Sequence, residues 1–93
     1  MKIGDPILVP FDDVTLPDSF LTQTELSGIK LYATDTLSVA GLDESLEGKS
    51  QKYAVLVEYP DEEFLHVYMY PTEEDVLEEI WDIEYRIADF IYT

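Results

Sequence analysis

The sequence predicts an α+β fold: a small antiparallel β-sheet with a long C-terminal α-helix packed on one face. Three observations lead to this expectation. Apolar residues near the end of the chain recur at steps of three and four, the period of a helix with one buried side. Before them lie two segments rich in Tyr, Val and Phe, joined by a short polar connection as in a β-hairpin. The chain has 93 residues, so a single domain over residues 1–93 is expected.

The first part of the chain has the weakest periodicity. Residues 7–9 form a short apolar run with a proline on each side, which favours an edge strand or an extended arm. Residues 16–26 are predicted to contain one or two helical turns. Pro17 suits a first helical turn, and Ser27 with Gly28 suits a helix end.

The middle of the chain contains the predicted sheet. Residues 29–33 and 37–40 are expected to be short strands, and the polar segment 41–51 is expected to be a loop. Residues 52–59 and 64–70 are the two strands of the hairpin.

One side of the predicted hairpin is aliphatic. Leu65, Val67 and Met69 alternate along the second strand, and Ala54 and Leu56 are their same-side candidates on the first. We expect this side to meet the helix.

The other side of the hairpin is aromatic. Its members are Tyr53, Tyr59, Phe64, His66, Tyr68 and Tyr70. Such a surface needs its own cover, and the N-terminal segment is the first candidate. A homodimer interface is the alternative, because aromatic residues are enriched at interface cores.

The last segment is predicted to be a helix from about residue 73 to 90. Thr72 can cap its first turn, and Asp75 three residues later can complete a variant of the capping box. Negative charge in the first turn also suits the helix dipole. The expected buried stripe consists of Val76, Ile80, Ile83, Ile87 and either Phe90 or Ile91, widened by Leu77, Trp81 and Ala88.

The charge of the chain is far from balanced. Asp and Glu number 21 against 5 Lys and Arg, which gives a formal net charge of -16. Nucleic acid and anionic membranes would repel this chain, so basic surfaces are the expected partners. The first residues include no apolar signal region, and no apolar run approaches a membrane span, so a cytoplasmic protein is expected.

Catalysis and specific metal binding are not expected. The chain has no cysteine, and its one histidine, His66, lies in a predicted strand without a nucleophile motif. Calcium-loop spacing fails when started at Asp35 or at Asp43, and no Gly-rich phosphate motif is present. We therefore expect neither an enzyme nor a cofactor.

Acidic residues are densest from Glu58 to Asp89. On the predicted helix, Glu74, Glu78 and Asp82 are spaced by four, and Asp75 and Glu79 start a neighbouring row. Four residues rise about 6 Å along a helix, and phosphates of one DNA strand rise about 3.4 Å along its axis, so the row imitates a phosphate strand approximately. The predicted partner-binding residues are Glu58, Asp61, Glu62, Glu63, Glu74, Asp75, Glu78, Glu79, Asp82 and Asp89.

A solvated helix face is the simpler interpretation of these rows. Such a face normally mixes Glu with Lys four residues apart, because that pairing stabilises a helix. Here like charges repeat at that spacing, which costs roughly a few tenths of a kcal/mol per pair. Selection for a basic partner would explain why the chain keeps them.

The segment from Thr72 to Asp89, about a fifth of the chain, resembles small acidic phage proteins that imitate DNA. Arn-like anti-restriction proteins are the nearest of these, and some anti-CRISPR proteins and uracil-glycosylase inhibitors belong to the same broad group. The likeness is one of charge and type rather than of motif. It implies inhibition of a host DNA-binding protein, such as a restriction nuclease, a nucleoid protein or another defence protein.

The function expected from the sequence is that of an acidic DNA-mimic inhibitor. The alternative is an acidic protein-interaction module or antitoxin-like inhibitor that does not imitate DNA. In that alternative, the aromatic surface around Tyr68 and Tyr70 would matter more than charge.

Overall fold

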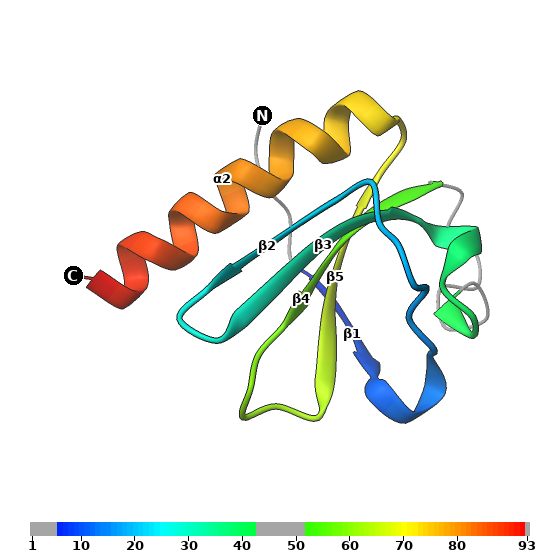
Figure 1. Cartoon of the computed structure of the whole chain (residues 1–93), viewed down its shortest axis with the longest axis horizontal. Helices are drawn as coiled ribbons and strands as arrows, with labels where there is room; N and C mark the ends of the chain where they lie inside the picture. Colours follow the sequence, from blue (N-terminus) through cyan, green and yellow to red (C-terminus); the bar gives the residue numbers. More distant parts are fainter. Residues whose placement is uncertain (1–5, 43–51, 93) are drawn as a thin grey trace.

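A five-stranded antiparallel sheet, crossed on one face by a long C-terminal helix, forms the body of the described structure (Figure 1). The computed structural model describes residues 6–42 and 52–92. The elements in chain order are β1 (Ile7–Pro10), the short 3-10 helix η1 (Phe11–Asp13), β2 (Thr22–Leu26), β3 (Ile29–Asp35), the 3-10 helix η2 (Thr36–Ser38), β4 (Tyr53–Glu58), β5 (Phe64–Tyr70) and the α-helix α2 (Glu73–Tyr92). The strand order is β1-β5-β4-β3-β2. The predicted α+β class is confirmed.

The predicted helical turns in residues 16–26 are wrong. Thr22–Leu26 is strand β2, which pairs with β3 from Thr22 opposite Ala33 to Leu26 opposite Ile29. Ser27 and Gly28 do not end a helix. Both have positive φ, 52° and 86°, as the two-residue turn of a β-hairpin requires.

The predicted strand at residues 37–40 is also wrong. After β3 the chain forms η2, in which the Asp35 carboxylate accepts a hydrogen bond of 2.7 Å from the Ser38 backbone N–H. Only an isolated bridge remains, in which Ala40 and Thr15 exchange backbone hydrogen bonds. Most of the predicted loop 41–51 lies outside the described residues.

The predicted hairpin is confirmed. β4 and β5 are antiparallel, with a register that runs from Tyr53 opposite Tyr70 to Glu58 opposite Leu65. β1 pairs with the other side of β5, which confirms residues 7–9 as an edge strand.

Helix α2 begins as the sequence predicts and extends two residues beyond the expected end. The Asp75 backbone N–H donates a hydrogen bond of 3.2 Å to the Thr72 side-chain oxygen, so Thr72 caps the first turn. The Val76 N–H bonds to the Thr72 carbonyl oxygen. Only Pro71 and Thr72 separate β5 from α2, so the helix turns back across the sheet at once.

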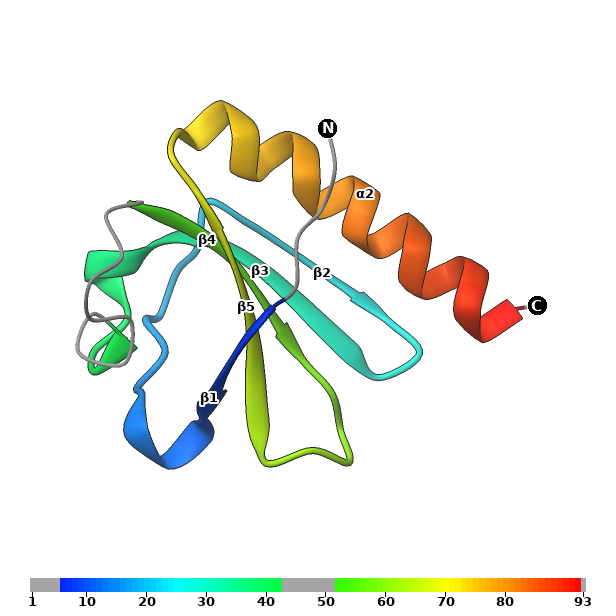
Figure 2. The ribbon, with the colours of Figure 1, turned by 180° about the vertical axis from the view of Figure 1, so that it is seen from behind.

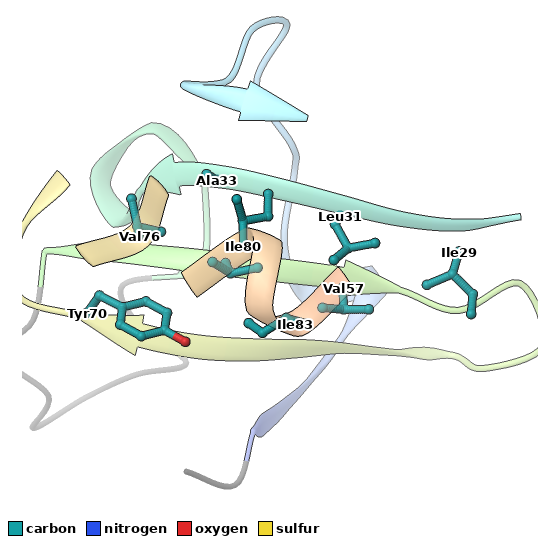
Figure 3. Packing of buried hydrophobic residues seen from close by; sticks show 9 residues of the cluster. Ile29, Leu31, Ala33, Val57, Tyr70, Val76, Ile80 and Ile83 are labelled. Carbon is teal, nitrogen blue, oxygen red and sulfur yellow. The ribbon is translucent and has the colours of Figure 1, made fainter. Parts of the chain in front are cut away.

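The side of the hairpin that meets α2 is the opposite of the predicted one. Val76, Ile80 and Ile83 of α2 pack over β3 and β4, with the Tyr70 ring of β5 at the margin of the cluster (Figure 3). Tyr53, Tyr59 and Tyr68 are partly buried against the same cluster. The tyrosines of the aromatic side therefore pack in the cluster beneath α2 and not against the N-terminal segment, whereas Phe64 is 42% exposed. A homodimer stays a prediction, but α2 covers much of the surface expected to form it.

The aliphatic side forms a second cluster on the other face of the sheet. Its buried members are Val9, Val39, Leu42, Ala54, Leu56, Leu65 and Val67, with Met69 partly buried beside them. Phe11, Val14 and Leu16 from the N-terminal segment pack against it. The N-terminal segment is thus a cover, as expected, but for the aliphatic face.

Candidate functional site: the outer face of helix α2

Helix α2 carries eight acidic residues and one basic residue, Arg86. Four of the predicted partner-binding acids on it are exposed: Glu74, Glu78, Asp82 and Asp89. They lie on the side of the helix turned away from the buried stripe, because they are offset from Val76, Ile80 and Ile83 by about half a turn. From Glu74 to Asp89 the helix rises about 22 Å. We call Glu74, Glu78 and Asp82 the acidic ridge.

Glu79 does not belong to this exposed surface, contrary to the prediction. Its side chain is 4% exposed, and its Oε2 atom is buried without a hydrogen-bond partner among the described residues. The position explains the burial: Glu79 lies three residues after Val76 and four before Ile83, both of which face the sheet. A partner molecule cannot reach this carboxyl group while the helix is packed.

Glu79 affects the ionisation of the Tyr70 hydroxyl. Burial raises the pKa of the Tyr70 hydroxyl well above its ordinary value of 10.0, and the Glu79 carboxylate raises it further. Tyr70 is 7% exposed, so the alternative in which it forms an interaction surface is not supported by its position.

Two further predicted residues are only partly exposed. Asp75 is half-buried in the first turn of α2. Glu58 lies at the end of β4, where its Oε2 atom is 3.9 Å from Lys30 Nζ on the neighbouring strand β3. Glu58 is thus placed against a base within the chain, which weakens its case as a contact for a basic partner.

The acids of the β4–β5 connection form a separate group. Asp61, Glu62 and Glu63 are exposed, and the Glu62 carboxylate lies 3.1 Å from His66 Nε2. This connection and α2 lie at opposite ends of β5 (Figures 1 and 2). Because a strand of seven residues spans roughly 20 Å, the structure does not join the two acidic groups into one patch.

Two exposed aromatic side chains, neither of them predicted from the sequence to lie on the surface, border the acidic ridge. Trp81 is 72% exposed and Tyr85 is 75% exposed. The prediction that Trp81 widens the buried stripe is wrong. Leu77 is half-buried at the margin of the stripe, and each step of four residues turns about 40° further around the helix, so Trp81 and Tyr85 point progressively outward. Phe90 is also exposed, and Ile91 packs in its place.

A shallow hollow of about 370 Å³ lies beside the ridge, between α2 and the edge strand β2. Its lining residues are Thr22, Glu74, Leu77, Glu78 and Trp81. The hollow thus combines an apolar wall from Leu77 and Trp81 with two carboxylates. That combination suits a ligand group that is flat or long-stemmed and positively charged.

Within residues 6–42 and 52–92, no three side chains of His, Asp or Glu are grouped so that they could hold a metal ion. No helix among them has the length and apolar character needed to cross a membrane.

Comparison of the chain with protein-family models, with curated proteins and with solved structures finds no match. The function is therefore inferred from the residues of the chain itself.

Proposed function

We propose that the protein is a non-catalytic, acidic inhibitor that occupies the DNA-binding surface of a basic protein, such as a nuclease or another defence protein. The acidic ridge of α2 is the part that imitates a phosphate strand. The proposed place of action is the cytoplasm, where such a partner meets DNA and where a chain without cysteine suffers no disadvantage.

The observation that carries this proposal is the row of like charges in the acidic ridge. Glu74, Glu78 and Asp82 are exposed at successive four-residue steps, and none of them has a basic residue four positions away except Asp82, which has Arg86. Like charges at this spacing destabilise a helix rather than stabilise it. A rigid helix holds them in a line, so a basic groove can meet several carboxylates at once without ordering them first.

The experiment is capture of proteins from a bacterial lysate on the immobilised chain, followed by competition with duplex DNA. Three chains are compared: the natural chain, a ridge variant (Glu74→Gln, Glu78→Gln, Asp82→Asn) and a control variant (Asp12→Asn, Asp13→Asn, Asp18→Asn). Both variants lose three negative charges, but the control residues are exposed in η1 and the segment after it, away from α2.

We expect a basic DNA-binding protein to be retained at low salt, released by duplex DNA and lost from the ridge variant only. Salt sensitivity alone is insufficient, because any acidic surface gives it. Retention that DNA does not displace would contradict DNA mimicry. Equal loss in the two variants would show that net charge, and not the ridge, holds the partner.

The second candidate is an acidic interaction module that does not imitate DNA. It is favoured by the exposed Trp81 and Tyr85, because Trp and Tyr are frequent anchors at protein interfaces and DNA offers no counterpart to them. Under this function, a partner would resist competition by DNA and would be lost when Trp81 is replaced.

A further inference from the structure

The hollow beside the acidic ridge places an exposed indole ring next to two carboxylates. Trp81 is 72% exposed, and it lines the hollow together with Leu77, Glu74 and Glu78. Thr22 of β2 closes the other side. Tyr85 and Phe90 of the same helix are even more exposed, but Trp81 is the exposed aromatic residue that lines this hollow beside two carboxylates.

We propose that this hollow receives an arginine side chain from the basic partner. The guanidinium group would stack on the Trp81 ring and donate hydrogen bonds to Glu74 and Glu78, while its aliphatic stem covers Leu77. This inference rests on the proposed function, because the arginine belongs to the partner's basic surface, and it specifies which basic residue that surface must present.

Arginine fits the lining better than lysine. Its planar head stacks on an aromatic face and offers several N–H donors at once, so two carboxylates and one ring are satisfied together. An ammonium group is more strongly hydrated and loses more on leaving water for a ring face. The hollow should therefore separate two ligands of the same charge.

A second copy of this chain does not suit the same face. Two copies that met through Trp81 would bring their ridges together, and each chain carries a net charge of -16. Like charges placed opposite one another across an interface cost several kcal/mol. Charge complementarity points to a basic occupant instead.

Trp81 is also the reporter of its own environment, because it is the chain's one tryptophan. The full chain is titrated with an oligoarginine peptide and with an oligolysine peptide of equal length, at low and at high ionic strength. We expect oligoarginine to shift the Trp81 emission and to bind about tenfold more tightly than oligolysine.

Two variants test whether Trp81 is the source of the preference for arginine over lysine. Calorimetry measures the Kd of each peptide. Trp81→Leu should bind both peptides with nearly equal Kd, because charge attraction remains and the ring is gone. Tyr85→Leu is the matched control, since Tyr85 is exposed one turn further along and does not line the hollow. It should keep most of the preference for arginine.

The outcomes separate the hollow from the wider function. Equal binding of the two peptides by the natural chain, or a preference that survives Trp81→Leu, overturns the arginine site and leaves a ridge that binds bases without distinction. Absence of binding at low ionic strength counts against both proposals. An emission shift that depends on the concentration of the chain alone would assign the face to self-association and overturn the arginine site as well.

Discussion

Glu79 places a carboxyl group on the packed side of α2, near Tyr70. Its Oε2 atom is buried and has no hydrogen-bond partner among the described residues. A buried polar group without a partner costs about 1–3 kcal/mol, and more when it is charged. The energy of this site therefore opposes the packing that Val76 and Ile80 provide on either side of it.

Replacing Glu79 should stabilise the fold. We expect Glu79→Met to raise the free energy of unfolding by about 1–3 kcal/mol, because methionine fills the volume without an unpaired oxygen. Urea denaturation measures the change. Glu78→Met is the matched control: it removes the same charge from the neighbouring exposed position, and such surface changes usually stay within about 0.5 kcal/mol. A loss of stability in Glu79→Met would mean that the carboxyl group has a compensating role.

Residue type is a poor guide to burial at two positions of α2. Glu79 is acidic yet buried, and Trp81 is apolar yet exposed. Spacing alone indicates the burial of Glu79, since position 79 is three and four residues from Val76 and Ile83. The helix and most of its buried stripe could be predicted from the sequence. Residue type alone could not distinguish the exposed acids of the helix from the buried Glu79.

At the scale of elements, both faces of the sheet carry apolar residues. The sequence therefore does not reveal which face packs against α2. Alternation predicts which residues share a side, and the sides of β4 and β5 were grouped correctly. It does not say which side a later helix covers. The sheet has one buried cluster on each face, and α2 packs on the face that carries the tyrosines.

Strand β2 was missed for a local reason. Its sequence, Thr-Gln-Thr-Glu-Leu, contains few of the residues that favour strands strongly, and its sides are partly exposed. Pairing with β3 through the Ser27-Gly28 turn decides its conformation. A tight turn and a helix end both use a residue with positive φ, so the same two residues supported both interpretations.

The contact between η1 and the residues after η2 depends on Gly41. Its φ is 88°, and a side chain at this position would overlap the backbone carbonyl oxygen of Asp13. We expect Gly41→Ala to destabilise the fold by about 1–3 kcal/mol more than Gly28→Ala does, because the backbones at Asp13 and Gly41 must move apart to admit the new side chain. Thermal or urea unfolding measures both variants.

Gly28 is an informative control for that comparison. Its φ is 86°, so alanine there suffers the same backbone strain, but the nearest atom to an added Cβ is Pro60 Cγ at 3.9 Å, an ordinary contact. The difference between the variants therefore isolates the steric overlap. Equal destabilisation would show that the backbones at Asp13 and Gly41 can move apart without a further loss of stability.

At the scale of the whole molecule, charge repulsion acts across its full width. The principal extents are 37 × 28 × 24 Å. At low ionic strength, near 0.01 M, the screening length is about 30 Å, which is comparable with these extents, so acidic side chains on different elements repel one another. At physiological ionic strength it falls to about 8 Å, and repulsion becomes local.

Salt should therefore stabilise this protein against unfolding. We expect the free energy of unfolding to rise by about 1 kcal/mol or more between these two ionic strengths, because repulsion within the compact state is screened. Urea midpoints at the two salt concentrations test this. The ridge variant should show a smaller rise, since three of the charges that repel one another are already removed. A salt effect of the opposite sign would mean that pairs such as Lys30 with Glu58 outweigh the repulsion.

Strand β1 pairs with a strand that lies far along the chain from it. β1 lies at residues 7–10 and pairs with residues 64–67 of β5, whereas β2 through β5 follow one another as neighbours in space. A ribosome therefore releases β1 long before β5 exists, and Val9 can enter the aliphatic cluster only after the hairpin has emerged. Because distant pairings are slow to form, β1 should be the last strand to dock during synthesis and the first to peel away under a pulling force.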